Sequence, residues 1–289
     1  MNWVQNTAAG NSKWWSWWLG IVVILVIYLV LGSIPAVIGT MNGLINLEPG
    51  GSMMSGSANP VQFVLLMCSP LMLFVGVWMA QRLVHRRSIS ALLSANGFRW
   101  PLLWQGMGIW LALGILFTLV ESLLYPGRYS WTFDFSKWIV IAPLVLLLIP
   151  IQAAGEELFF RGYLLQAIAR LRAHPILLVF ASGVLFMLPH LSNPEMSNAL
   201  GGQIPMALNY FLMGVGLAWV SLRDNGIERA IGIHVVNNLY AGVFVGYANS
   251  VLSTPTFFEA NVIDGWLGVG TLVCSFAVIL LMNRSAHRE

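Results

Sequence analysis

Three short polar segments stand out in a chain whose surrounding sequence is strongly apolar. An ionisable side chain near the centre of a membrane span is energetically costly, so it normally faces a protein interior or a water-filled cavity. The three segments therefore predict a functional site. They are Glu156-Glu157-x-x-x-Arg161, Phe186-x-x-x-His190 and His234-x-x-x-Asn238.

In the first segment, helical spacing separates the two carboxylates. Glu157 and Arg161 lie four residues apart and share a helix face, which predicts an internal ion pair. Glu156 points about 100° away and can meet neighbouring helices. The alternative is a solvated helix end. The uncharged run 138–155 before it and the largely apolar residues after it favour a position inside the membrane.

His190 is predicted to lie at the height of Glu156. The short connection near residue 173 predicts that the helices on either side are antiparallel neighbours. Glu156 lies seventeen residues before residue 173 and His190 seventeen residues after it. At an equal rise per residue, both side chains reach the same level of the bundle. The alternative for His190 is a side chain at the membrane interface beside Pro189.

His234 and Asn238 also lie four residues apart and present two hydrogen-bonding groups on one face. The alternative is hydrogen bonding between helices, a common use of His and Asn in membrane bundles. Together, the side chains of the three segments could catalyse the attack of water on a peptide carbonyl. Glu156 would be the general base, and His190 would share the water. His234 and Asn238 would donate to the developing oxyanion.

No serine or cysteine in this sequence lies in a motif typical of a catalytic nucleophile. Gly-x-Ser-x-Gly and His-Glu-x-x-His are both absent. Cys68 and Cys274 lie in apolar stretches, so we expect small buried hydrophobic residues and neither a disulfide nor a metal pair.

The composition indicates an integral membrane protein. Of 289 residues, 58% are hydrophobic and 9% charged, with a net charge of +3, whereas an average soluble domain is about 25% charged. This excludes a disordered chain, a disulfide-rich secreted scaffold and a nucleic-acid partner.

The expected fold class is an all-α, polytopic membrane helix bundle surrounded by lipid. About eight transmembrane helices are predicted, over residues 15–38, 60–81, 102–124, 138–170, 174–190, 205–222, 228–247 and 264–283.

The distribution of Lys and Arg predicts the orientation. With both termini in the cytoplasm, eleven of these residues fall on the cytoplasmic side and only Arg128 and Lys137 on the other. We therefore expect a multi-pass protein of the cell (cytoplasmic) membrane. Its one integrated membrane domain would comprise helices 1–3 in residues 1–137, core helices 4–7 in 138–246, and helix 8 with a short tail in 247–289.

The order and span positions of the three motifs resemble those of the type II CAAX prenyl endopeptidases and their bacterial relatives, the CAAX protease and bacteriocin-processing (CPBP, or Abi) intramembrane proteases. The resemblance covers about residues 138–246. It implies an endopeptidase acting on a membrane-associated or prenylated peptide. Glu156 and His190 would activate water, His234 and Asn238 would stabilise the oxyanion, and Glu157 and Arg161 would be supporting residues.

A metal is the first open alternative. The family is often labelled a metalloprotease, and Glu156, His190 and His234 could form a zinc site of two His and one carboxylate. No locally spaced chelating pair exists in this sequence. We therefore expect a glutamate mechanism without a cofactor, with Zn²⁺ as the alternative.

Two further functions compete with proteolysis. Buried Glu, His and Arg also form proton relays, so a proton-coupled transporter is one alternative. The sequence shows no repeated half, and its intramembrane ionisable groups lie in the C-terminal half. The other alternative is a non-catalytic membrane protein that binds a partner, as in bacteriocin immunity.

Overall fold

The computed structural model describes residues 2–5, 10–45, 59–95, 97–247, 250, 252 and 254–285, and most of them are helical. The N-terminal helices are α1 (Asn2–Gln5), α2 (Trp14–Leu25), the π-helical η1 (Val26–Leu31), α3 (Ile34–Met41), α4 (Pro60–Met79), η2 (Ala80–Val84), α5 (Ser90–Leu93) and α6 (Trp100–Leu124). The C-terminal helices are α7 (Phe135–Glu157), η3 (Leu158–Leu164), α8 (Leu165–Leu171), α9 (Pro175–His190), α10 (Glu195–Asn198), α11 (Gln203–Asp224), α12 (Glu228–Leu239), η4 (Tyr240–Phe244) and α13 (Gly265–Ser285).

The predicted polytopic helical fold is confirmed, and every predicted helix has a counterpart. Within the described residues, six helical runs are long and apolar enough to cross a membrane. The fifth predicted helix is the shorter apolar α9, and the seventh is α12 with η4. The number of complete crossings and the orientation stay predictions. The six runs are Trp14–Met41, Pro60–Val84, Trp100–Leu124, Phe135–Leu171, Gln203–Asp224 and Gly265–Met282.

One long helical run carries the first polar segment. Asp134 caps its start by accepting hydrogen bonds from the backbone N–H groups of Ser136 and Lys137. The run then continues through α7, η3 and α8 for 37 residues without a break. Because backbone groups in hydrocarbon must be satisfied within the segment, a continuous helix is the stable form of this apolar sequence. Glu156 and Glu157 end α7, well inside the run.

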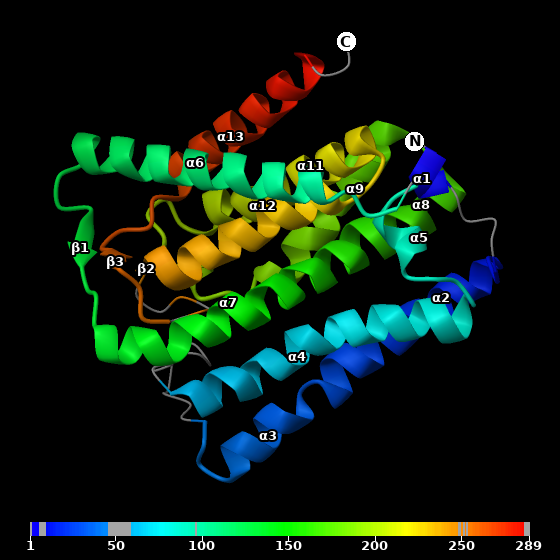
Figure 1. The fold of residues 1–289 in the computed structure, drawn as a ribbon, viewed down its shortest axis with the longest axis horizontal. Coiled ribbons are helices and arrows are strands. Elements are labelled where there is room, and N and C mark those ends of the chain that lie inside the picture. The colour runs from blue at the N-terminus through cyan, green and yellow to red at the C-terminus, as the bar shows by residue number, and fades with distance from the viewer. Residues whose placement is uncertain are drawn as a thin grey trace.

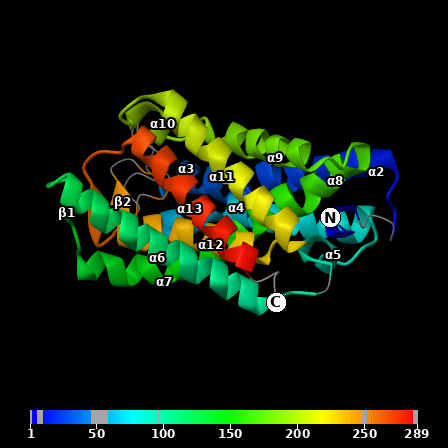
Figure 2. The same ribbon diagram turned by 90° about the horizontal axis from the view of Figure 1, so that it is seen from above.

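The helices form two groups, and α12, a member of the first group, contacts both. Figure 1 shows α2, α4, α7, α12 and α6 lying side by side, while α9, α11 and α13 pack together beside them (Figure 2). The first nine residues of α12, Glu228–Val236, are all buried. The predicted helix 228–247 is too long, because it ends at Phe244 and residues 245–247 form a strand.

A glycine allows α12 to approach α6 closely. A Cβ atom added at Gly232 would lie only 2.2 Å from the backbone oxygen of Leu103. Small residues at such contacts let two membrane helices meet backbone to backbone. This contact fixes the helix that carries His234 and Asn238.

A small sheet lies at one end of the bundle, where α6 connects to α7 (Figure 1). Its strand order is β1-β3-β2. Strand β3 is antiparallel to β1, with Ser130 opposite Glu259, and parallel to β2, with Gly246 opposite Glu259. The all-α prediction missed these three-residue strands, which are too short for a recognisable alternation. They are β1 (Tyr129–Trp131), β2 (Val245–Tyr247) and β3 (Phe258–Ala260).

The prediction that both cysteines are buried is wrong. Cys274 is exposed on α13 and Cys68 is half-buried. In a membrane helix, an apolar surrounding sequence indicates contact with lipid as readily as contact with a protein core. Both cysteines are free, as expected from the sequence.

Candidate active site

The buried carboxylate of Glu157 joins two elements of the site. Its Oε1 atom lies 2.6 Å from Nη1 of Arg161 and accepts a hydrogen bond from Nδ1 of His234 at 2.7 Å. The side chains of Glu157 and Arg161 are fully buried and that of His234 is 4% exposed. The ion pair expected from the helical spacing is therefore present. The bond to His234, which fastens the end of α7 to α12, was not foreseen.

Arg161 extends this connection to α9 and α11. Its guanidinium carbon lies 4.4 Å from the centre of the Phe186 ring, a distance typical of a cation–π contact. Its Nη2 atom donates to the backbone oxygen of Gly214 at 3.4 Å. Arg161 thus contacts three helices, and its charge is compensated by Glu157.

Glu156 lies in a different environment. Its Oε1 atom accepts a hydrogen bond from Nε2 of Gln152, one turn earlier on α7. Its Oε2 atom is buried, lies 3.7 Å from Nε2 of His234, and has no hydrogen-bond partner among the described residues. Because a buried carboxylate oxygen is costly to leave unsatisfied, Oε2 can accept a hydrogen bond from a water or a ligand.

Gln152 connects Glu156 to Asn238. The Oε1 atom of Gln152 accepts a hydrogen bond from Nδ2 of Asn238 at 3.2 Å. One side-chain amide therefore holds the carboxylate on α7 and the amide on α12 together. Gln152 was not among the residues predicted from the sequence. The available signal was its position four residues before Glu156, on the same helix face.

His190 completes the group from the end of α9. Its Nδ1 atom is 2.7 Å from the backbone oxygen of Phe186. Because a carbonyl oxygen only accepts, Nδ1 carries the hydrogen, and Nε2 is left as the acceptor. The Phe186 ring contacts both imidazoles, with its centre 4.6 Å from that of His190 and 5.7 Å from that of His234. His190 also lies near Glu156 and His234.

Two comparisons identify relatives of this chain. Residues 136–240, which contain all three polar segments, match the family model described as type II CAAX prenyl endopeptidase Rce1-like. YyaK of Bacillus subtilis strain 168, described as an uncharacterized protein, is 31% identical over 269 residues, or 90% of this chain and 88% of YyaK. The chain belongs to the Rce1-like family. No solved structure matches it.

Membership in the Rce1-like family confirms the resemblance found in the sequence. The family is one of peptidases, and the chain carries several membrane-spanning helices. This Rce1-like protein is therefore a multi-pass membrane protease. The roles of Glu156, His190, His234 and Asn238 stay predictions at this point.

The predicted metal ligands fit a metal ion only in part. In both imidazoles of the Rce1-like site, Nδ1 is bound to an oxygen and Nε2 remains available, as is usual for histidine ligands. However, no group of three or more His, Cys, Asp and Glu side chains in the described part of the chain is arranged to hold one ion. The residues as placed do not form the zinc site of Glu156, His190 and His234.

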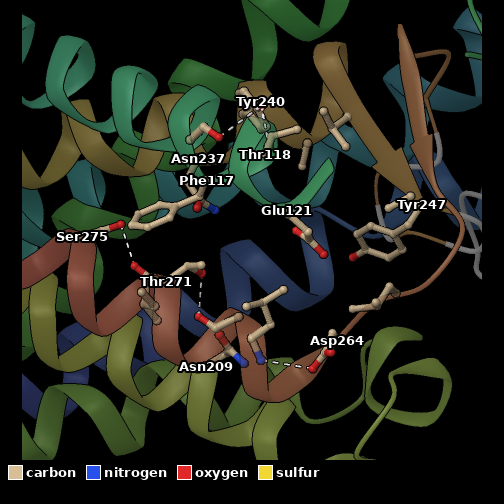
Figure 3. A pocket seen from close by; sticks show the side chains of 18 of the residues that line it. Phe117, Thr118, Glu121, Asn209, Asn237, Tyr240, Tyr247, Asp264, Thr271 and Ser275 are labelled. Atoms are coloured by element: carbon tan, nitrogen blue, oxygen red, sulfur yellow. Dashed lines mark hydrogen bonds between the residues drawn. The ribbon is translucent and has the colours of Figure 1, made fainter. Parts of the chain in front are cut away.

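A separate pocket lies against another face of α12 (Figure 3). It has a volume of about 390 Å³ and is lined by residues of α6, α11, α12, η4, α13 and the sheet. The described residues that line this pocket do not include the four proposed catalytic residues, Glu156, His190, His234 and Asn238. Asn237 lines it and accepts a hydrogen bond from Trp110 of α6, which joins two helices. It also donates to Asn238, its neighbour in α12.

Proposed function

We propose that this Rce1-like protein is an intramembrane endopeptidase of the cytoplasmic membrane, cleaving a peptide bond in a membrane-associated or prenylated substrate with water activated by Glu156 and His190. The observation that carries the proposal is the free Oε2 atom of Glu156. It is buried, has no hydrogen-bond partner among the described residues and lies beside His234.

In the first step, Glu156 takes a proton from water as the water oxygen forms a bond to the carbonyl carbon of the peptide. Nε2 of His190 accepts a hydrogen bond from the second O–H of that water and orients the water, while this O–H bond stays intact. The electron pair of the C=O double bond moves to the oxygen and forms an oxyanion. The protonated Glu156 then gives its proton to the amide nitrogen as the C–N bond breaks, yielding an acid and an amine.

The oxyanion has two donors on α12. The side-chain amide of Asn238 donates one of its N–H groups to Gln152, and its second N–H group can donate to the substrate. His234 donates from Nε2 when it carries a proton on both nitrogens, and the carboxylate of Glu157 stabilises that imidazolium from the other side. Arg161 in turn compensates the charge of Glu157.

Glu156, and not Glu157, is the proposed base because the two carboxylates differ in their partners. Glu157 binds Arg161 and His234 through one oxygen at 2.6 and 2.7 Å. Protonation of Glu157 would remove the charge that strengthens both of these bonds. Oε1 of Glu156 accepts a hydrogen bond from a neutral amide, and its Oε2 lies 3.7 Å from Nε2 of His234. Oε2 of Glu157 likewise has no hydrogen-bond partner among the described residues, so the two carboxylates differ in what binds Oε1.

The test uses the purified protein in liposomes with a prenylated peptide ending in a CAAX sequence and the same peptide without the prenyl group. We expect cleavage of at least one of them, lost in Glu156→Gln and in His190→Ala. The matched control is Glu121→Gln in α6, whose carboxylate pairs with Arg128 away from this site. Cleavage retained by Glu156→Gln would refute the proposed mechanism.

The same assay addresses the cofactor. We propose that no metal takes part, which is supported by the absence of local chelating spacing in the sequence and by the placement of the three side chains. Activity should survive exhaustive chelation. Loss of activity that is restored by Zn²⁺ would show instead that Glu156 serves as a ligand.

A further inference from the structure

A third carboxylate, besides Glu156 and Glu157, is buried near His190 and has no role in the mechanism above. Glu195, in α10, is 4% exposed. Its Oε1 atom accepts hydrogen bonds from the hydroxyl of Tyr210 in α11 and from Nδ2 of Asn193, the latter at 3.2 Å. Asn193 also donates to the Tyr210 oxygen at 2.9 Å. The three side chains form a closed cluster in which the phenol both donates and accepts.

This cluster holds one face of His190. The Tyr210 ring stacks on the imidazole at 4.5 Å between ring centres and 25° between planes. Phe186 makes the other close ring contact, at 4.6 Å. In addition, the backbone N–H of Asn193 donates to the backbone oxygen of His190 at 3.1 Å. The imidazole therefore contacts two rings, and its own backbone is tied to the same cluster.

The partners of Glu195 are neutral donors. Among the described residues, no Arg, Lys or His forms a salt bridge with it. Tyr247 of β2, which lines the pocket in Figure 3, also interacts with Glu195. Burial, together with the charge of Glu195, raises the pKa of Tyr247, so its phenol stays protonated and able to donate. A buried carboxylate that accepts hydrogen bonds from a phenol and an amide can hold the phenol ring in one position.

We infer that Tyr210, locked by Glu195 and Asn193, is a positioning residue that fixes the plane of the His190 imidazole, so that its free Nε2 atom stays directed at the attacking water. The inference rests on the proposed function, because His190 acts on the water there. A catalytic group misplaced by about 1 Å can lower a rate by about 100-fold, which makes such a support effective.

Three substitutions separate the contributions. Tyr210→Leu removes the ring, and we expect kcat to fall by about 100-fold with KM within about twofold. Tyr210→Phe keeps the stacked ring and loses only the link to Glu195, so it should recover much of that loss. Glu195→Gln removes the charge that holds the phenol. Because Tyr210→Phe and Glu195→Gln break the same link, their effects should not add in the double variant.

The matched control is Tyr240→Phe in η4. It removes a phenol that donates to Thr118 at 2.8 Å, away from His190. Its kcat should equal that of the wild type. A Tyr210→Leu variant that folds and keeps its kcat would overturn the inference, and so would additive effects of Tyr210→Phe and Glu195→Gln.

A readout without substrate keeps the inference separate from the proposed function. In protein labelled with ¹⁵N-histidine, the His190 signal, assigned by its loss in His190→Ala, should report hydrogen on Nδ1. In Tyr210→Leu, a mobile ring should give averaged nitrogen shifts. If the wild type cleaves no peptide but this change is seen, the proposed function fails and the positioning role stands. An unchanged His190 signal overturns the positioning role even if cleavage is observed.

Discussion

At the residue scale, the adjacent carboxylates Glu156 and Glu157 have different surroundings. We therefore expect their substitutions to have different effects on folding and on proteolysis. Glu157→Gln leaves Arg161 buried without its counter-charge and weakens the bond to His234. Breaking a buried pair in this way costs about 3–5 kcal/mol. We expect a reduced folded yield in detergent, measured by size-exclusion chromatography. Glu156→Gln should fold normally and lose proteolysis. The reverse pattern would mean that the two roles are exchanged.

Gln152 gives a second prediction at this scale. Gln152→Leu removes the amide that holds both Glu156 and Asn238. We expect kcat to fall by about 10- to 100-fold with little change in KM, because the base and an oxyanion donor lose their fixed positions. The control is Gln166→Leu, which removes a buried amide bound to the backbone of Ala91. It should lower the unfolding temperature and leave the kcat of the folded protein unchanged.

At the scale of elements, the position of α12 depends on its close contact with α6. Gly232→Ala would place a Cβ atom 2.2 Å from the Leu103 carbonyl oxygen, so α6 or α12 must move. Overpacking of this kind costs about 1–3 kcal/mol. We expect a lower unfolding temperature and loss of activity, since His234 and Asn238 move with the helix.

The matched control for this contact is Gly108→Ala in α6, where a Cβ atom would meet no atom within 4 Å. Alanine is favoured over glycine in a helix by up to about 1 kcal/mol, so this variant should be at least as stable as the wild type. Equal unfolding temperatures for the two variants, measured by differential scanning fluorimetry, would contradict the proposed importance of the contact.

For the whole molecule, the charges at the two ends predict the orientation. At the sheet end lie only the cations Arg128, which pairs with Glu121 and Asp264, and Lys137, which pairs with Asp134, among the described residues. Most other Lys and Arg residues lie in, or within a few residues of, the connections that the sequence predicts on the cytoplasmic side. We therefore expect the sheet end outside the cytoplasm. Reporter fusions in the connections 85–89 and 125–128 should give opposite signals, and signals from the same side would refute the orientation.

The sequence by itself determined which helices form and which side chains carry chemistry. Long uncharged runs leave helix as the stable backbone form in lipid, and four-residue spacing places Glu157 beside Arg161 whatever surrounds them. Family membership also follows from the motifs. These properties are local, because they depend on spacing within one segment.

Only the tertiary structure decided how the segments meet. The bond from His234 to Glu157, the link from Asn238 through Gln152 to Glu156, and the stacking of Tyr210 on His190 all join different helices. Neutral Gln and Tyr side chains carry no signal of burial cost, so the sequence did not single them out. Which polar groups satisfy one another depends on how closely and at what rotation the helices pack, and short contacts such as that at Gly232 set this only in the folded bundle.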